Sequence, residues 1–202
     1  HVAPLAAAIA ESRGEYLSIL NDDDLLEPTM VEQLLGGFWC YPQTVLSFGL
    51  HRVINSQGVE LQAETSRHRK RQTSIAASSG LVSDAFSFAL LGGIMVGMGS
   101  VFRKAACDSR WLIPEVAGAY DYWLALHLAG KGRFYFLPEI VMSWRQHEDS
   151  VTARPSTGKF SAEIFIYEQL RNLDLPPGLA NYVRDQLAYY AYLRGREYLI
   201  RG

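Results

Sequence analysis

The sequence predicts an α/β fold, in which apolar strands alternate with amphipathic helices. Three segments support this prediction: an apolar run that ends in acidic residues, a stretch rich in Val, Leu and Phe, and a strongly apolar helical stretch, at 16–20, 44–54 and 120–129. The chain has 202 residues, of which 49% are hydrophobic, so it can bury a core of its own. Ligands of α/β sheets bind beyond the carboxyl ends of strands, which makes the acidic residues after position 20 the first candidate site.

Composition excludes some classes of function. The net charge of −2 gives no general affinity for nucleic acid or for an anionic membrane, so no nucleic-acid partner is expected. No apolar run approaches the roughly 20 residues that a membrane-spanning helix needs. Cys40 and Cys107 form no metal-binding or disulfide pattern, and we expect reduced thiols, as in cytosolic proteins.

The elements of the first half follow from apolar spacing and from turn residues. Pro4 suits the first turn of the first helix, and Gly14 follows its end. The predicted order is helix, strand, acidic loop, helix, strand, hairpin-type turn and short strand, at 1–12, 15–20, 21–27, 28–37, 44–54, 56–58 and 59–62. The second helix is expected to have one apolar side and a glycine-weakened end, formed by Met30, Val31, Leu34, Leu35, Gly36 and Gly37.

The second half predicts a helix, a glycine-bearing strand, a loop, a helix, two strands separated by Pro138 and two C-terminal helices, at 79–91, 94–102, 112–118, 120–129, 133–137, 139–144, 160–173 and 180–199. The basic run 67–71 lies in a polar stretch and is interpreted as a solvated loop. The alternative is a mobile loop that meets a diphosphate or an acidic acceptor.

Asn21, Asp22, Asp23 and Asp24 follow directly after the predicted strand 15–20. Carboxylates packed so closely repel one another unless a cation lies between them. Oxygen ligands suit Mg²⁺, Mn²⁺ or Ca²⁺ rather than zinc. The alternative interpretation is a solvated turn, because Asp and Asn favour turns and helix N-caps.

Asp121 is the second candidate, at the start of the predicted helix 120–129. Helical spacing places it on one face with Leu124, Ala125 and Leu128, at the positive end of the helix dipole. Burial raises the pKa of such a carboxyl group and the dipole lowers it, which can produce a general base. The alternative is a helix cap, for which Asp is also a preferred residue.

The third candidate is the pair Arg145 and His147, after the predicted strand 139–144. They alternate with Trp144 and Gln146, so they point to the same side of an extended chain. An Arg and a His that converge there suit an anionic group, or a metal ion bound through the imidazole. The alternative is an exposed strand end with incidental polar residues.

These three points occur in the order of a known family. The segment 12–28, S-R-G-E-Y-L-S-I-L-N-D-D-D-L-L-E-P, resembles the A-x-G-E-Y-(apolar)-D-x-D-D-x-x-x-P segment of glycosyltransferase family 2. The segment 121–129 is similar to the family's E-D-x-x-L-W-L-R-L-A helix, and 137–147 to its L-P-E … Y-R-x-H segment. The resemblance extends from about residue 6 to residue 152, and it implies the Rossmann-like GT-A fold, a mixed sheet flanked by helices.

The resemblance also implies an inverting transferase that uses a UDP-, GDP- or dTDP-sugar, a divalent metal (Mn²⁺ or Mg²⁺) and a glycan or lipid-linked acceptor, in cell-surface polysaccharide synthesis. Asp121 matches the catalytic base. The positions that match the donor-diphosphate contacts are Asp22, Asp23, Arg145 and His147. The positions that match the metal site are Asp23, Asp24 and His147. Such chemistry implies a cytoplasmic protein, with the inner face of the membrane as one place of action.

The chain departs from the family at several positions. Asn21, Tyr120 and His127 replace an Asp, an acidic residue and an Arg, and the nucleotide-binding first half of the family is absent. We therefore expect a fragment of a longer protein, with a partial GT-A domain at 1–155 and a C-terminal helical extension at 156–202. A degenerate binding module and a sugar nucleotidyltransferase are the alternatives.

The helical extension carries an apolar stripe formed by Val183, Leu187, Tyr190 and Ala191, beside arginines. Packing against the catalytic domain is the expected role of this stripe. Docking to a membrane surface or to a partner protein is the alternative, because Tyr and Arg suit both.

Overall fold

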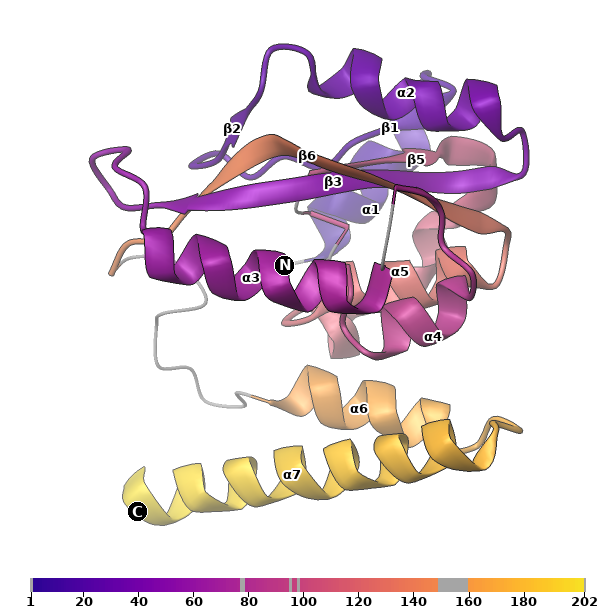
Figure 1. Cartoon of the computed structure of the whole chain (residues 1–202). Helices are drawn as coiled ribbons and strands as arrows, with labels where there is room; N and C mark the ends of the chain where they lie inside the picture. Colours follow the sequence, from indigo (N-terminus) through magenta and orange to yellow (C-terminus); the bar gives the residue numbers. More distant parts are fainter. Residues whose placement is uncertain (1, 77–78, 95, 98, 149–159, 202) are drawn as a thin grey trace.

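The computed structural model describes all residues except 1, 77–78, 95, 98, 149–159 and 202. A mixed sheet forms the centre of the molecule, with helix α2 on one face and helices α3, α4 and α5 on the other (Figure 1). Helices α6 and α7 form an outer pair beyond α4 and α5. The α/β prediction is therefore confirmed. The boundary expected near residue 155 lies outside the described residues.

The described part of the sheet has six strands, β1 (Tyr16–Leu17), β2 (Leu25–Leu26), β3 (Thr44–Ile54), β4 (Gly80–Leu81), β5 (Ser100–Arg103) and β6 (Arg133–Arg145). Their order is β1-β5-β3-β6-β2, and β4 also pairs with β6. The long central pair, β3 and β6, is parallel, and the other pairs are antiparallel. Both central strands thus end on the same side, where the loop between β1 and β2 also lies.

The helices are α1 (Val2–Glu11), α2 (Met30–Cys40), α3 (Gln62–Ala76), α4 (Ala85–Leu90), α5 (Tyr120–Ala129), α6 (Ser161–Leu170) and α7 (Pro177–Arg201). Three short 3₁₀ turns, η1 (Lys104–Ala106), η2 (Ser109–Trp111) and η3 (Pro114–Val116), connect β5 to α5. In the described part of the chain, no helix is both long enough and apolar enough to cross a membrane.

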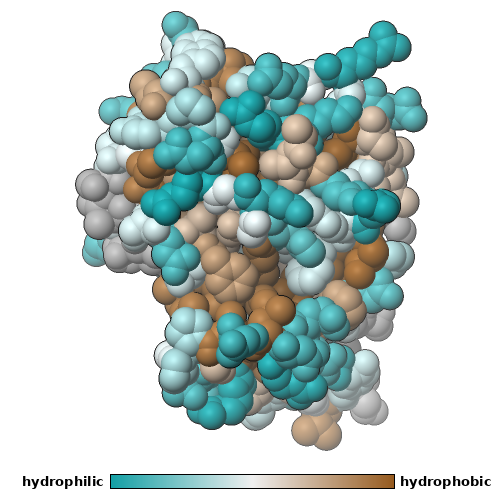
Figure 2. All heavy atoms as spheres, turned by 90° about the vertical axis from the view of Figure 1, so that its right-hand side faces the viewer, coloured by the Kyte–Doolittle hydropathy of each residue, from teal (hydrophilic) through white to brown (hydrophobic). Residues whose placement is uncertain are grey.

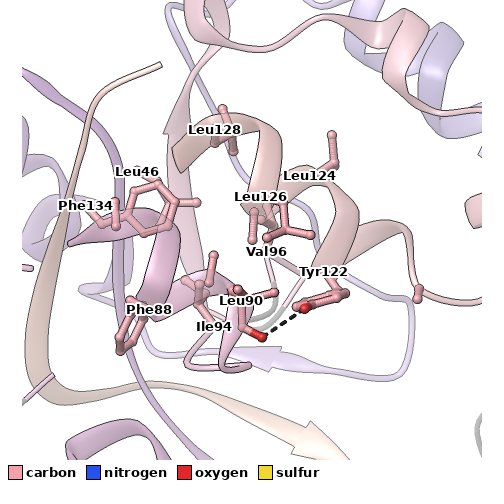
Figure 3. Close-up of a cluster of buried hydrophobic side chains, with 14 of the residues drawn as sticks. Leu46, Phe88, Leu90, Ile94, Val96, Tyr122, Leu124, Leu126, Leu128 and Phe134 are labelled. Carbon is pink, nitrogen blue, oxygen red and sulfur yellow. Dashed lines mark hydrogen bonds between the residues drawn. The ribbon is translucent and has the colours of Figure 1, made fainter. Parts of the chain in front are cut away.

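The core has one part on each face of the sheet. The larger part joins the sheet to α4 and α5, and Figure 3 shows its side chains converging from these elements: Leu46, Phe88, Leu90, Leu124, Leu128 and Phe134. The smaller part lies under α2 and consists of Met30, Leu34, Phe38, Val101 and Val141. Because β3 is covered on both faces, nearly all of it is buried, which explains its continuous apolar sequence.

Several predicted elements match the structure, and others differ in length. Strand β3 and helix α5 have the predicted bounds. The predicted strands 15–20 and 94–102 are much shorter, as β1 and β5, because only a few of their residues reach a partner strand. The predicted strand 59–62 is reduced to a single bridge between Ile54 and Glu60. The predicted helix 79–91 is divided into β4 and the short helix α4.

The two strands predicted on either side of Pro138 are one strand, β6. Its pairing with β3 passes from Gly49–Leu137 directly to Leu50–Ile140, so Pro138 and Glu139 are left over as a bulge. Pro has no amide hydrogen and is tolerated in a sheet at such an irregularity. The strand therefore continues past Pro138 to Arg145, at the candidate site.

The prediction of a solvated loop for the basic run 67–71 is wrong, because the run lies inside helix α3. Arg, Lys, Gln and Ala have high helix propensity. The helix is docked through polar contacts, since the Thr65 hydroxyl accepts a hydrogen bond from Val53 N at 2.9 Å. A polar helix that docks in this way shows no apolar periodicity in its sequence.

Helix α2 differs from its prediction at both ends. It begins at Met30 rather than Pro28, and it continues through Gly36 and Gly37 to Cys40. Val31, expected on the apolar side, is 51% exposed. Gly37 is buried where the ring of Tyr135 packs against the helix, so this glycine serves a close contact rather than a helix end.

The C-terminal helices pack onto the core as expected. Val183 is buried, while Leu187 and Tyr190 pack partly against the core, and the rings of Tyr167 and Tyr190 stack at 5.7 Å. Ala191, predicted in the same stripe, is exposed. Figure 2 shows hydrophobic side chains gathered in the waist between the main body above and the C-terminal helices below.

Candidate functional site

The acidic loop lies between β1 and β2, beside the carboxyl end of β6. Asp24 is only 6% exposed, and both of its carboxylate oxygens accept hydrogen bonds. Its Oδ1 accepts from Arg145 N at 2.8 Å, and its Oδ2 accepts from Asn21 Nδ2 at 2.9 Å. Asp24 therefore ties the acidic loop to the end of β6.

Arg145 strengthens the same connection with its side chain. Its Nε donates to the carbonyl oxygen of Asp23 at 2.8 Å, and its Nη1 donates to the carbonyl oxygens of Asn55 and Ser56 at 3.0 and 3.1 Å. The guanidinium group thus holds the acidic loop and the turn after β3 together. Its Nη2 has no hydrogen bond to a described residue.

The side chain of Asp23 faces His147. The Nε2 atom of His147 lies 3.0 Å from Oδ2 of Asp23, and both side chains are about one third exposed or less. Asp22, in contrast, is exposed, and within the described part of the chain no hydrogen bond or ion pair ties its carboxylate down. The loop therefore contains one buried anchor, one half-buried carboxylate paired with an imidazole, and one exposed carboxylate.

Asp121 occupies the first turn of α5. The N-cap of this helix is Ala119, so Asp121 does not have the N-cap position, but its Oδ1 accepts a hydrogen bond from Tyr122 N at 2.8 Å. Burial raises the pKa of its carboxyl group, and the amides of Tyr122 and Asp121 itself oppose this shift. Leu124, Ala125 and Leu128, expected on the same face, are all fully buried.

Tyr120 directly precedes Asp121 at the start of α5. Burial, together with the charges of Asp121 and Asp24, raises the pKa of its hydroxyl to about 12. The hydroxyl is therefore protonated at neutral pH. In the sequence, Tyr120 is notable only as a departure from the family pattern, because nothing there indicates a relation to Asp24.

The pKa of Asp24 in the acidic loop is also shifted. Burial raises the pKa of Asp24, and the charge of Asp23 adds to this effect, whereas the hydrogen bonds from Arg145 and Asn21 oppose it. A cation near Asp23 would relieve the repulsion between these carboxylates.

The donor atoms of the site suit a divalent cation in part. Asp23 and His147 form a preorganised oxygen and nitrogen pair, which is compatible with Mn²⁺. The oxygens of Asp24 are already engaged as hydrogen-bond acceptors. Among the described residues, no group of three or more His, Cys, Asp or Glu side chains is arranged to hold a metal ion. Any further ligands of a cation here would come from a bound molecule or from water.

Comparison with known proteins gives one informative result. No protein-family profile matches the sequence, and no curated protein matches it. The structure is similar to that of S. aureus TarS 1-349 in complex with UDP-GlcNAc, with a TM-score of 0.62 and 14% sequence identity. The match covers 94% of this chain and 51% of the TarS chain, so this chain spans about half the length of that structure. The likeness shows a glycosyltransferase-like fold.

Proposed function

We propose that this protein is a metal-dependent, inverting glycosyltransferase of family 2, which transfers a sugar from a nucleotide-sugar donor to a hydroxyl acceptor. One observation carries the proposal: on a glycosyltransferase-like fold, Arg145 and His147 both reach Asp23 from the end of β6. Asp23, Asp121, Arg145 and His147 match the family pattern in order and in spacing, and Tyr120 is a departure from it. The structurally similar TarS was solved with UDP-GlcNAc, which makes a UDP-sugar the first donor to test.

Asp23 and His147 are the side chains that would hold a divalent cation. When bound, the cation supplies positive charge that neutralises the departing diphosphate. Arg145 keeps the loop in position, because its Nε and Nη1 atoms donate to backbone carbonyls. Its Nη2 atom could then donate a hydrogen bond to an anionic group of the ligand. Asp24 braces the loop from within, and Asp22, which is exposed, can reach a ligand's polar groups.

Asp121 is the proposed general base. An acceptor oxygen forms the new bond to the anomeric carbon of the sugar, the bond from this carbon to the diphosphate oxygen breaks, and the acceptor proton passes to the Asp121 carboxylate. A single displacement of this kind inverts the configuration at the anomeric carbon. The raised pKa of Asp121 makes its carboxylate a stronger base than an exposed Asp.

Calorimetric titration with UDP, with and without Mn²⁺, tests the proposal. We expect Mn²⁺ to increase the affinity for UDP by at least about 10-fold, since it screens the diphosphate charge. We expect Asp23→Ala to abolish this increase. Asp174→Ala is the matched control, because Asp174 is exposed and lies outside the site, and it is expected to behave like the wild type.

Two outcomes would count against the proposal. Affinity for UDP that does not depend on Mn²⁺ would contradict the metal-dependent mechanism. The absence of binding to UDP, GDP and dTDP would favour a binding module that has lost catalysis.

We further propose that the acceptor is a hydroxyl group of a glycan or a lipid-linked glycan, and that the reaction takes place in the cytoplasm during synthesis of a surface polysaccharide.

A further inference from the structure

Tyr120 presents an unused polar group next to the proposed base. Its hydroxyl oxygen lies against Gly97, where a Cβ atom would be only 3.4 Å away. Gly97 is buried and Tyr120 is half-buried, so the hydroxyl lies against the packed backbone at this position. Glycine at position 97 leaves this approach free of a side chain.

The hydroxyl of Tyr120 has no hydrogen bond to any described residue. Tyr122, two residues later in the same helix, shows the contrasting case, because its hydroxyl donates to the Leu90 carbonyl at 2.9 Å (Figure 3) and lies 3.2 Å from the Tyr167 hydroxyl. A hydroxyl without a protein partner can donate its hydrogen bond to a bound ligand. The hydroxyl of Tyr122 thus serves the fold, whereas the hydroxyl of Tyr120 is available to bind a ligand.

The position of this hydroxyl indicates its ligand. Tyr120 directly precedes Asp121 in the first turn of α5, so it lies beside the proposed base, and the charges of Asp121 and of Asp24 in the acidic loop both raise the pKa of its hydroxyl. The sugar that is transferred must occupy the space between the diphosphate and the base. A protonated hydroxyl donates to sugar oxygens, whereas a carboxylate at position 120 would only accept and would add negative charge beside Asp121.

We propose that the Tyr120 hydroxyl donates a hydrogen bond to an oxygen of the sugar that is transferred, and so contributes to the recognition of the donor sugar. The inference rests on the proposed glycosyltransferase function. It assigns Tyr120 to the sugar and not to the nucleotide. The two parts of the donor can therefore be separated in a binding experiment.

The test compares UDP with UDP-GlcNAc, UDP-glucose and UDP-galactose by calorimetry in Mn²⁺, for the wild type and Tyr120→Phe. We expect the affinity for UDP to be unchanged and that for at least one UDP-sugar to fall about 5-fold, as for the loss of one neutral hydrogen bond. The melting temperature of Tyr120→Phe is expected to equal that of the wild type. Tyr122→Phe is the control, expected to melt at a lower temperature but to keep all four affinities.

The possible failures are distinguishable. Equal affinities of the wild type and Tyr120→Phe for every UDP-sugar would overturn the assignment of Tyr120 while leaving the proposed function intact. A parallel loss for UDP and the UDP-sugars would overturn it as well, because the hydroxyl would then serve the nucleotide or the fold. A wild type that binds none of the four compounds, and neither GDP nor dTDP, would overturn the proposed function, and this inference with it.

Discussion

The Nε2 atom of His147 lies 3.0 Å from Oδ2 of Asp23, although the two residues are 124 positions apart in the sequence. The contact depends on Arg145, whose backbone and side chain bond to Asp24 and to the Asp23 carbonyl and so bring the end of β6 against the acidic loop. Because the backbone is held on both sides, the imidazole and the carboxylate are oriented before any ligand binds.

Replacing His147 tests whether this pair binds a metal ion. We expect His147→Ala to weaken Mn²⁺ binding by about 10-fold or more, as measured by electron paramagnetic resonance of free Mn²⁺. If both side chains hold the same ion, the double variant with Asp23→Ala should bind little worse than either single variant. Additive losses in the double variant would show that the two residues act at separate places.

Asp121→Asn tests the proposed base. The amide retains the size of the side chain but cannot accept the acceptor proton, so we expect kcat to fall about 100- to 1,000-fold. The affinity for UDP in Mn²⁺ is expected to stay the same, because Asp121 contacts neither metal nor diphosphate in this scheme. An unchanged kcat in steady-state turnover of a UDP-sugar would exclude Asp121 as the base.

The pH dependence of the wild type should reflect the environment of Asp121. Burial raises the pKa of its carboxyl group above the ordinary value of 3.8, and only the ionised form accepts a proton. We therefore expect kcat/KM to fall as the pH is lowered through this raised pKa, at a higher pH than an exposed Asp would give. Activity that stayed constant down to pH 4 would contradict a carboxylate base with a raised pKa.

Gly36 and Gly37 are neighbours in α2 with opposite surroundings. A Cβ atom at Gly36 would meet nothing within 4 Å, whereas one at Gly37 would lie 2.5 Å from the ring of Tyr135. Gly36→Ala should raise the free energy of unfolding by about 1 kcal/mol through helix propensity. Gly37→Ala should lower it by about 1–2 kcal/mol through overpacking. Urea denaturation measures both, and equal shifts in the two variants would contradict the packing seen here.

His51 predicts a loss of stability in acid. It is 3% exposed, its ring nitrogens have no hydrogen-bond partner among the described residues, and it packs against His68 with ring centroids 4.9 Å apart. Burial, with a contribution from His68, lowers the pKa of His51 to about 4.

The unfolded chain therefore binds a proton at this residue near pH 6.5, while the folded protein does so only near pH 4. Stability is highest above the unfolded pKa and is lost as the pH falls between these values, by about 3 kcal/mol in total. In His51→Phe this part of the pH dependence should disappear. Parallel stability curves for the two proteins between pH 7.5 and 4, measured by urea denaturation, would contradict the assignment.

The fold was predictable where a segment carries its own pattern. Strand β3 is buried on both faces and α5 is apolar over most of its surface, so their bounds follow from local composition. Strands β1 and β5 were overestimated, because an apolar run shows only that residues are buried and not which of them pair. Helix α3 was missed because it docks through Thr65 and His68 rather than through an apolar face.

The candidate residues could be selected from the sequence, whereas their contacts could not. The spacing of Arg145 and His147 predicted that both would face an anionic group or a metal ion. In the structure, His147 faces the Asp23 carboxylate, whereas the Arg145 guanidinium bonds to the backbone carbonyl of Asp23. Nothing in the sequence indicated that Arg145 would also bond to Asn55 and Ser56, since that contact requires the parallel pairing of β3 with β6.

The sequence by itself determined which chemical groups are present and which strands and helices carry them. It placed carboxylates after a short strand, an Asp at a helix start, and an Arg and a His at a strand end. Tertiary structure decided what each group does. It buried Asp24 as an anchor, left Asp22 exposed, and set the Tyr120 hydroxyl near two carboxylates from different segments. Burial, partners and pKa depend on distances between segments far apart in the chain, and these are fixed only when the sheet assembles.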